Sequence, residues 1–264
     1  MHDAAGVLTM KDRLALLALA PLLVQQGRRV RATVPMLPEP PGDRRGTIGD
    51  GAPLKLLVLG DSAAAGVGAP TLEDALVGQV VARLAQRFRV AWRLEAATGR
   101  TTRGALERLD ELDGYPLEVV IVSLGINDLT SGIPSALFGR RQRRLQRALR
   151  ARGARHLVIS GLPPIGGFPA LPQPLRTVLG ARRTRFDRVL RRQTERIDGA
   201  EHLPIEGLGN ASMMATDGFH PGPPIYALWA AEVARRVEAA RTRRDADPAH
   251  DPISTRSPLQ GSEG

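Results

Sequence analysis

Near the end of the chain, Asp217 stands three residues before His220 in the segment TDGFHP. A carboxylate at this distance in a tight loop can bond one imidazole nitrogen and leave the other facing a hydroxyl. A serine nucleophile needs such a base, together with a carboxylate that fixes the tautomer of the base. The pair could instead form a structural turn or bind a metal. Because His156, His202 and His250 are scattered and show no H-x-x-x-H spacing, we expect no metal site.

Ser62 is the candidate nucleophile, in the segment GDSAAAG. It follows an apolar run that ends at Leu59 and precedes a helix, so its own amide would face the crevice beyond the strand. A helix N-terminus at that point favours a developing negative charge, and the three alanines after Ser62 leave room for a substrate. If this loop stood alone, a simple helix cap by Asp61 or Ser62 would be the better explanation of it.

Two further loops hold candidate donors for an oxyanion. Asn127 lies in the segment GIND, and its side-chain amide is a neutral hydrogen-bond donor. Gly99 lies in the segment AATGRTT, where a glycine lets the backbone approach a ligand and offer its N–H. Each segment could also be only a turn between a strand and the next helix.

Alternating strands and helices must position these loops. Apolar runs predict strands at 54–59, 90–94, 117–124, 156–160 and 201–205. Amphipathic spacing predicts helices at 72–88, 101–112, 135–152, from the loop at 162–174 to about 197, and at 225–240. This alternation is typical of an α/β fold, a three-layer α/β/α sandwich with a flavodoxin-like doubly wound parallel sheet of about five strands. Ligands of such sheets bind beyond the carboxyl ends of the strands, and the strand before Asn127 should neighbour the strand before Ser62.

The chain resembles the SGNH hydrolases, also called GDSL esterases and lipases, from roughly Leu54 to Ala240. The family's four blocks occur in order, as GDS at 60–62, Gly99, GIND at 125–128 and DGFHP at 217–221. The resemblance implies that Ser62 is the nucleophile, His220 the base and Asp217 its partner. It also implies an oxyanion hole formed by the Ser62 N–H, the Gly99 N–H and the Asn127 side chain.

The sequence departs from the family pattern at two places. Ala63 stands where a Leu usually follows the family's Ser, and Ala96 and Ala97 stand where an Asn often precedes the second-block Gly. Neither change removes a catalytic group, but both leave the substrate pocket open to question. The apolar loop at 162–174 could line an acyl pocket or could be a surface turn packed on the neighbouring helix.

The resemblance implies a serine esterase that acts through an acyl-enzyme and needs no cofactor. We expect carboxylic esters with short or medium acyl chains as substrates. The same site could instead serve a lysophospholipase, a thioesterase or a carbohydrate O-deacetylase. The expected partner is therefore a small-molecule or lipid ester.

A dinucleotide-binding oxidoreductase is a distant alternative. Gly60, Gly66 and Gly68 follow a strand, and Glu95 ends the next strand, where a ribose-binding acid would belong. The spacing is not G-x-G-x-x-G, however, and Asp61 would place a negative charge beside the phosphates. The chain also lacks the G-x-x-x-x-G-K-[ST] segment of a P-loop.

Composition excludes several other classes. The 264 residues carry a formal net charge of +10, no Cys, 42% hydrophobic residues and 3% aromatic residues. A disulfide framework, a cysteine nucleophile, wholesale disorder and a multi-span membrane protein are therefore excluded. Arginines crowd the helix at 135–152, but such a run is usually a solvated face. We expect no specific nucleic-acid binding and at most a weak attraction to anionic surfaces.

The first fifty residues differ from the rest. The apolar run Leu14–Val24 follows Lys11 and Arg13 and resembles the start of a secretory signal, although Pro21 interrupts it. It is too short to cross a bilayer, which takes about 20 residues. We expect a short helix lying on the domain or on a membrane surface, with a cytoplasmic or membrane-peripheral location favoured and secretion by a poor or uncleaved signal as the alternative.

The expected organisation has three parts. Residues 1–50 form the apolar helix and a Pro/Gly-rich linker at 35–51, residues 51–241 form the hydrolase domain, and residues 242–264 form a disordered tail.

Overall fold

Short apolar runs form a six-stranded sheet in the computed structural model, which describes residues 10–246 except 113, 206 and 208–209. The strands are β1 (Arg45–Ile48), β2 (Ala52–Gly60), β3 (Phe88–Ala96), β4 (Val119–Ser123), β5 (His156–Ser160) and β6 (Ala200–Leu203). Their order across the sheet is β1-β3-β2-β4-β5-β6. The strands β2 to β6 are parallel, and their order is that of a flavodoxin-like sheet. The predicted fold class is confirmed, including the pairing of β2 with β4.

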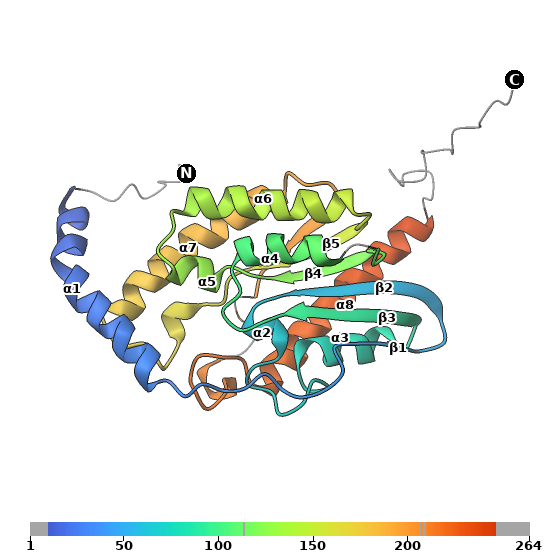
Figure 1. Cartoon of the computed structure of the whole chain (residues 1–264), viewed down its shortest axis with the longest axis horizontal. Helices are drawn as coiled ribbons and strands as arrows, with labels where there is room; N and C mark the ends of the chain where they lie inside the picture. Colours follow the sequence, from blue (N-terminus) through green and yellow to red (C-terminus); the bar gives the residue numbers. More distant parts are fainter. Residues whose placement is uncertain (1–9, 113, 206, 208–209, 247–264) are drawn as a thin grey trace, which may run out of the picture.

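Helices cover both faces of this sheet (Figure 1). The helices of the described residues are α1 (Met10–Thr33), α2 (Ser62–Ala65), α3 (Leu76–Leu84), α4 (Thr102–Leu109), α5 (Ile126–Thr130), α6 (Ser135–Ala151), α7 (Leu175–Thr194) and α8 (Pro223–Ala246), of which α1 lies beside α7 and not on the sheet. Single turns of 3-10 helix lie at Asp110–Leu112, Ile165–Gly167 and Ala211–Met213. One layer contains α3 and α8, and the other contains α4, α6 and α7.

The central strand β2 shows why its sequence is a continuous apolar run. Leu56 and Val58 are buried in the cluster beneath α3 and α8, whereas Leu57 and Leu59 are buried in the cluster beneath α4, α6 and α7. A strand covered on both faces needs apolar side chains on both sides. Its carboxyl end at Gly60 therefore emerges from the core directly into the loop that carries Ser62.

The sheet contains one strand that the sequence does not indicate. The expected linker at 35–51 contains β1, which pairs with β3 in the antiparallel sense at the sheet edge. All four residues of β1 are exposed. An edge strand of this kind is held by backbone hydrogen bonds and needs no apolar alternation, so the linker prediction was wrong for Arg45–Ile48.

Several helix bounds also differ from prediction. The helix expected at 72–88 is α3 alone, because Thr71 and Asp74 hydrogen-bond each other in a turn before it and Phe88 already begins β3. Near the C-terminus, α8 continues to Ala246, beyond residue 242, where the disordered tail was expected to start. Arg244 donates to Glu118 at 2.9 Å and stabilises this last stretch. Residues 247–264 lie outside the described residues.

The N-terminal helix α1 is longer than its apolar run and continues through Pro21. Its Leu23 and Val30 pack against the apolar cluster beside α7. Gln26 donates to the Gln173 carbonyl at 2.6 Å and accepts from the Leu175 amide at 3.1 Å. The helix thus lies on the domain, while contact with a membrane stays a prediction. Within the described residues, no helix has the length and apolar character needed to cross a bilayer.

Candidate active site

The nucleophile loop turns sharply at the end of β2. The Asp61 amide donates to the Ser123 carbonyl of β4 at 3.1 Å, and the Asp61 side chain caps α2 by accepting from the Ala63 amide at 3.2 Å. A Cβ at Gly60 would lie 2.3 Å from Ala64 and 2.6 Å from the Ser123 oxygen, so only glycine fits this turn. Because Asp61 provides the cap, the Ser62 hydroxyl remains free for another partner.

That partner is His220, in the loop before α8. The Ser62 Oγ lies 2.9 Å from His220 Nε2, and His220 Nδ1 lies 2.6 Å from Asp217 Oδ2. The other carboxylate oxygen of Asp217 accepts the backbone amides of Phe219 and His220, both at 2.9 Å. The structure thus brings together in series the three side chains that the sequence pattern singled out.

Electrostatics keep the Asp217 carboxyl ionised. Burial alone would raise the pKa of Asp217, but the hydrogen bonds from His220 and from the two amides outweigh burial. The pKa of Asp217 is consequently lowered from its ordinary value. An ionised carboxylate beside Nδ1 favours the imidazole tautomer that carries its proton on Nδ1 and leaves Nε2 as an acceptor.

Close backbone contacts join the two loops that carry Ser62 and His220. A Cβ at Gly68 would lie 2.2 Å from the Pro221 carbonyl oxygen, so the two segments meet without a side chain between them. The buried Tyr226 hydroxyl, at the start of α8, donates to the Val67 carbonyl at 2.7 Å. These contacts explain how residues separated by 158 positions meet at hydrogen-bond distance.

The candidate oxyanion donors lie on neighbouring loops. Asn127, in the first turn of α5, donates from Nδ2 to the Arg100 carbonyl at 3.1 Å and borders the same cavity as Ser62. Gly99 has φ +79°, and a Cβ there would have no neighbour within 4 Å. Gly99 is connected to Asn127 only through its neighbour Arg100. Gly99 itself is exposed and, unlike Ser62 and Asn127, is not among the residues that line the cavity.

Sequence reasoning missed a buried connection between these loops. Asp128, next to Asn127, accepts both the amide and the hydroxyl of Thr102 at 2.8 Å, and Gln142 of α6 donates to the same hydroxyl at 2.9 Å. Burial raises the pKa of Asp128, although the Thr102 bonds and the charge of Arg141 oppose the shift. The Asn-Asp pair in the sequence was the available signal, but on its own that pair favours a simple turn.

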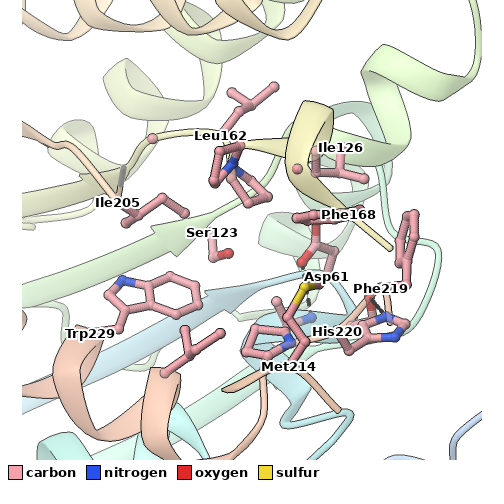
Figure 2. A pocket seen from close by; sticks show the side chains of 18 of the residues that line it. Asp61, Ser123, Ile126, Leu162, Phe168, Ile205, Met214, Phe219, His220 and Trp229 are labelled. Atoms are coloured by element: carbon pink, nitrogen blue, oxygen red, sulfur yellow. Dashed lines mark hydrogen bonds between the residues drawn. The ribbon is translucent and has the colours of Figure 1, made fainter. Parts of the chain in front are cut away.

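An apolar cavity of about 290 Å³ opens beside Ser62 and His220. Figure 2 shows Trp229 and Ile205 at the end of this cavity away from His220 and Phe219. The Trp229 indole N–H is hydrogen-bonded to Ser160 at 3.2 Å, which leaves an apolar ring face in the wall. Other apolar wall residues are Ala63, Leu124, Ile126, Leu162, Pro163, Pro164, Phe168, Ala211, Met214, Pro221 and Ile225.

The loop at 162–174 divides between its two expected roles. Leu162, Pro163, Pro164 and Phe168 line the cavity. Ile165 and Leu171 instead lie in a small buried cluster with Leu175, against which α1 packs. Within the described residues, no three His, Asp or Glu side chains are gathered as metal ligands.

Comparisons with known proteins identify the family to which the chain is similar. Residues 58–228 match the GDSL-like lipase/acylhydrolase family. A GDSL-like esterase of Mycobacterium tuberculosis is 32% identical over 214 residues, which are 74% of this chain and 65% of that protein. The chain thus spans just under two thirds of the length of the curated relative that it matches.

Solved structures share the fold. A psychrotrophic esterase from a Pseudoalteromonas species superimposes with a TM-score of 0.56 at 22% identity and covers 71% of this chain and 98% of its own. A carbohydrate acetylesterase from Sinorhizobium meliloti gives a TM-score of 0.55 at 18% identity, with 70% and 99% coverage.

The solved structures define the fold class of the chain. The chain belongs to the GDSL-like lipase/acylhydrolase family, because residues 58–228, more than half of its length, match that family.

Proposed function

We propose that this protein is a serine esterase that hydrolyses carboxylic esters with short or medium acyl chains. The observation that carries the proposal is the series of hydrogen bonds from Asp217 through His220 to Ser62 at the edge of an apolar cavity. In this proposal Ser62 is the nucleophile, His220 is the general base and acid, and Asp217 fixes the orientation and tautomer of the imidazole.

The reaction proceeds in two acyl transfers. The Ser62 Oγ attacks the ester carbonyl carbon while its proton passes to His220 Nε2, and a tetrahedral oxyanion forms. His220 then gives that proton to the leaving alcohol oxygen as the C–O bond breaks, which leaves an acyl-enzyme. Water attacks the acyl carbon by the same route, releases the carboxylic acid and restores the Ser62 hydroxyl.

The oxyanion is held by three donors in this proposal: the Ser62 amide, the Gly99 amide and the Asn127 side chain. An Asn side chain has two N–H groups. One of them already donates to the Arg100 carbonyl, so the other is available for the oxyanion while the first keeps the amide plane in place. Loss of a single donor of this kind typically costs about 10²–10³ in turnover.

The cavity favours an acyl chain over a sugar. Its walls are mainly aliphatic and aromatic, and an apolar chain gains about 0.8 kcal/mol for each methylene that it buries. A sugar ring would need several polar partners at fixed positions, and the described wall offers few. Esters, lysophospholipids and thioesters share an acyl chain, so an assay panel has to separate these three.

The test measures hydrolysis of p-nitrophenyl esters graded from acetate to decanoate, with an acyl-thioester, a lysophospholipid and an acetylated sugar alongside. We expect kcat/KM to rise with chain length up to a medium chain. Ser62→Ala should reduce kcat to the background rate, whereas Thr184→Ala, which removes an exposed hydroxyl on α7, should leave kcat unchanged.

A covalent probe supplies a second measurement. The Pseudoalteromonas esterase is described as inhibited by monoethylphosphonate, so an activated ethylphosphonate is a suitable reagent. Mass spectrometry should find one adduct per chain, on the peptide that contains Ser62. Equal ester hydrolysis by the wild type and Ser62→Ala would refute the proposal.

A further inference from the structure

The segment between α1 and β1, residues 34–44, contacts two loops of the candidate site, and we refer to it as the N-terminal strap. Pro40 of the strap is buried. A Cβ at Gly66, which ends α2, would lie 2.9 Å from the Pro40 ring. The strap is therefore packed directly against the loop that presents Ser62.

Glu39 connects the strap to a second loop of the site. One of its carboxylate oxygens accepts both the amide of Thr98 at 2.6 Å and the hydroxyl of Thr98 at 2.9 Å. The other oxygen pairs with Arg44 at 3.0 Å, and Arg44 also donates to the Ala96 carbonyl. Two residues of the strap thus hold two residues of the loop at 96–99.

The Glu39 carboxyl is held in its ionised form. Burial on its own raises the pKa of Glu39, but the Thr98 hydrogen bonds and Arg44 outweigh burial and hold the pKa below its usual range. The side chain is therefore an ionised acceptor at neutral pH, and hydrogen bonds to an ionised acceptor are stronger than neutral ones.

Thr98 precedes the candidate oxyanion donor. The Gly99 N–H belongs to the peptide plane that begins at the Thr98 carbonyl carbon, so the backbone setting of Thr98 determines where that N–H points. Apart from its two chain neighbours, no residue has a heavy atom within 4 Å of the place where a Gly99 Cβ would stand. The printed contacts of this turn are instead made by its flanking residues, since Thr98 bonds Glu39 and the Arg100 amide donates to the Ala97 carbonyl at 3.1 Å.

We propose that Glu39 is a positioning residue, which holds Thr98 so that the Gly99 amide stays directed at the oxyanion. This inference rests on the proposed esterase function. Glu39 lies outside the part of the chain that matches the family, which begins at residue 58. In this proposal the N-terminal strap helps to stabilise the transition state, although it lies outside the family match.

The test compares variants by their kcat and KM for one p-nitrophenyl ester. Glu39→Ala should lower kcat by about 10-fold with KM within about 2-fold, because a displaced oxyanion donor weakens transition-state binding more than substrate binding. Glu39→Gln should recover most of kcat, since its amide oxygen can still accept both Thr98 bonds. The matched control is Glu107→Ala, which removes an exposed ion pair with Arg103 on α4 and should leave kcat unchanged.

Hydrogen–deuterium exchange provides a readout that does not need activity. Glu39→Ala should speed exchange of the peptide that contains residues 96–100, whereas Glu107→Ala should not.

If Glu39→Ala leaves both this exchange and kcat at wild-type values, the inference is overturned. If exchange rises but the wild type shows no Ser62-dependent hydrolysis, the proposed esterase function fails while the contact between Glu39 and Thr98 stands. Should Glu39→Ala fail to fold, Thr98→Val, which removes only the hydroxyl bond, is compared instead and should lower kcat by a few-fold.

Discussion

The Asp217 carboxylate accepts three N–H groups, two from the backbone of its own loop and one from His220. The two backbone bonds close a tight turn at Asp217 and hold the carboxylate in place independently of the imidazole. The imidazole is in turn set by the carboxylate, and Ser62 by the imidazole. The hydrogen bonds therefore order this site in sequence, from the backbone turn through Asp217 and His220 to the Ser62 hydroxyl.

Replacement of Asp217 by Asn tests that order. An amide in place of the carboxylate can donate to Nδ1 and thereby place the imidazole proton on Nε2, where it blocks the acceptance of the Ser62 proton. We expect kcat to fall by roughly 10⁴, as for the same change in another Ser-His-Asp triad, with little change in KM.

The matched control for this prediction is Glu201→Gln. Glu201 pairs with His156 at 2.9 Å, and this contact is the main reason why the pKa of Glu201 is lowered to about 2. This second carboxylate–imidazole pair lies away from the cavity, so kcat should be unchanged. Equal losses in the two variants would mean that Asp217 contributes only to stability.

Single residues differ in how far the sequence predicts their contacts. Asp217 and His220 share one short loop, so their contact could be predicted from spacing alone. The contact of Asp128 with Thr102 and that of Glu39 with Thr98 join residues far apart in the chain. An acidic residue in a turn has the same local pattern whether it faces solvent or another loop, and only the tertiary arrangement distinguishes these cases.

At the scale of elements, burial decided which predictions were confirmed. The strands β2, β4 and β5 are covered on both faces and have the continuous apolar runs that such burial requires. By contrast, β1 is an exposed edge strand whose pairing is determined by the backbone of β3, so its side chains carry no signal. The helix α1 extends beyond its apolar run because polar residues such as Gln26 also contact the domain.

The junction between α2 and the loop before α8 gives a prediction at this scale. Gly68 has φ +97°, and a Cβ there would collide with the Pro221 carbonyl. Gly68→Ala should therefore separate the segments that carry Ser62 and His220 and should lower both stability and kcat. A positive φ alone costs a non-glycine residue roughly 1–2 kcal/mol, and the collision adds to that cost.

Gly132→Ala is the comparison for this junction, because Gly132 has φ +85° but open space around its Cβ position. Urea unfolding should show a loss of about 1 kcal/mol for Gly132→Ala and a clearly larger loss for Gly68→Ala. Only Gly68→Ala should reduce ester hydrolysis. Equal effects of the two substitutions would show that backbone strain, and not the junction, determines the outcome.

At the scale of the whole molecule, one buried carboxyl makes stability depend on pH. Burial, only partly offset by the bond from the Ala63 amide, raises the pKa of Asp61 from its ordinary value of 3.8 to about 7. Between these two values the folded protein keeps a proton that the unfolded chain has lost. The contribution of Asp61 to the free energy of unfolding therefore falls as pH rises through this window.

Asp61→Asn should remove this dependence, because an amide does not titrate and can still accept from Ala63. From pH 5 to pH 7, the wild type should lose on the order of 2 kcal/mol more stability than Asp61→Asn in urea unfolding. The exposed Asp50→Asn should follow the wild type. Parallel losses in all three proteins would contradict the assignment to Asp61.

The order in which the chain is synthesised has a consequence for when activity can begin. The hydroxyl at Ser62 follows the first parallel strand, but its imidazole partner precedes the last helix, α8, which must dock beside α3. A nascent polypeptide on the ribosome therefore lacks an assembled Ser62–His220 pair until α8 has emerged. In a renaturation experiment, the return of turnover would for the same reason mark the final assembly step, after the return of helical circular dichroism.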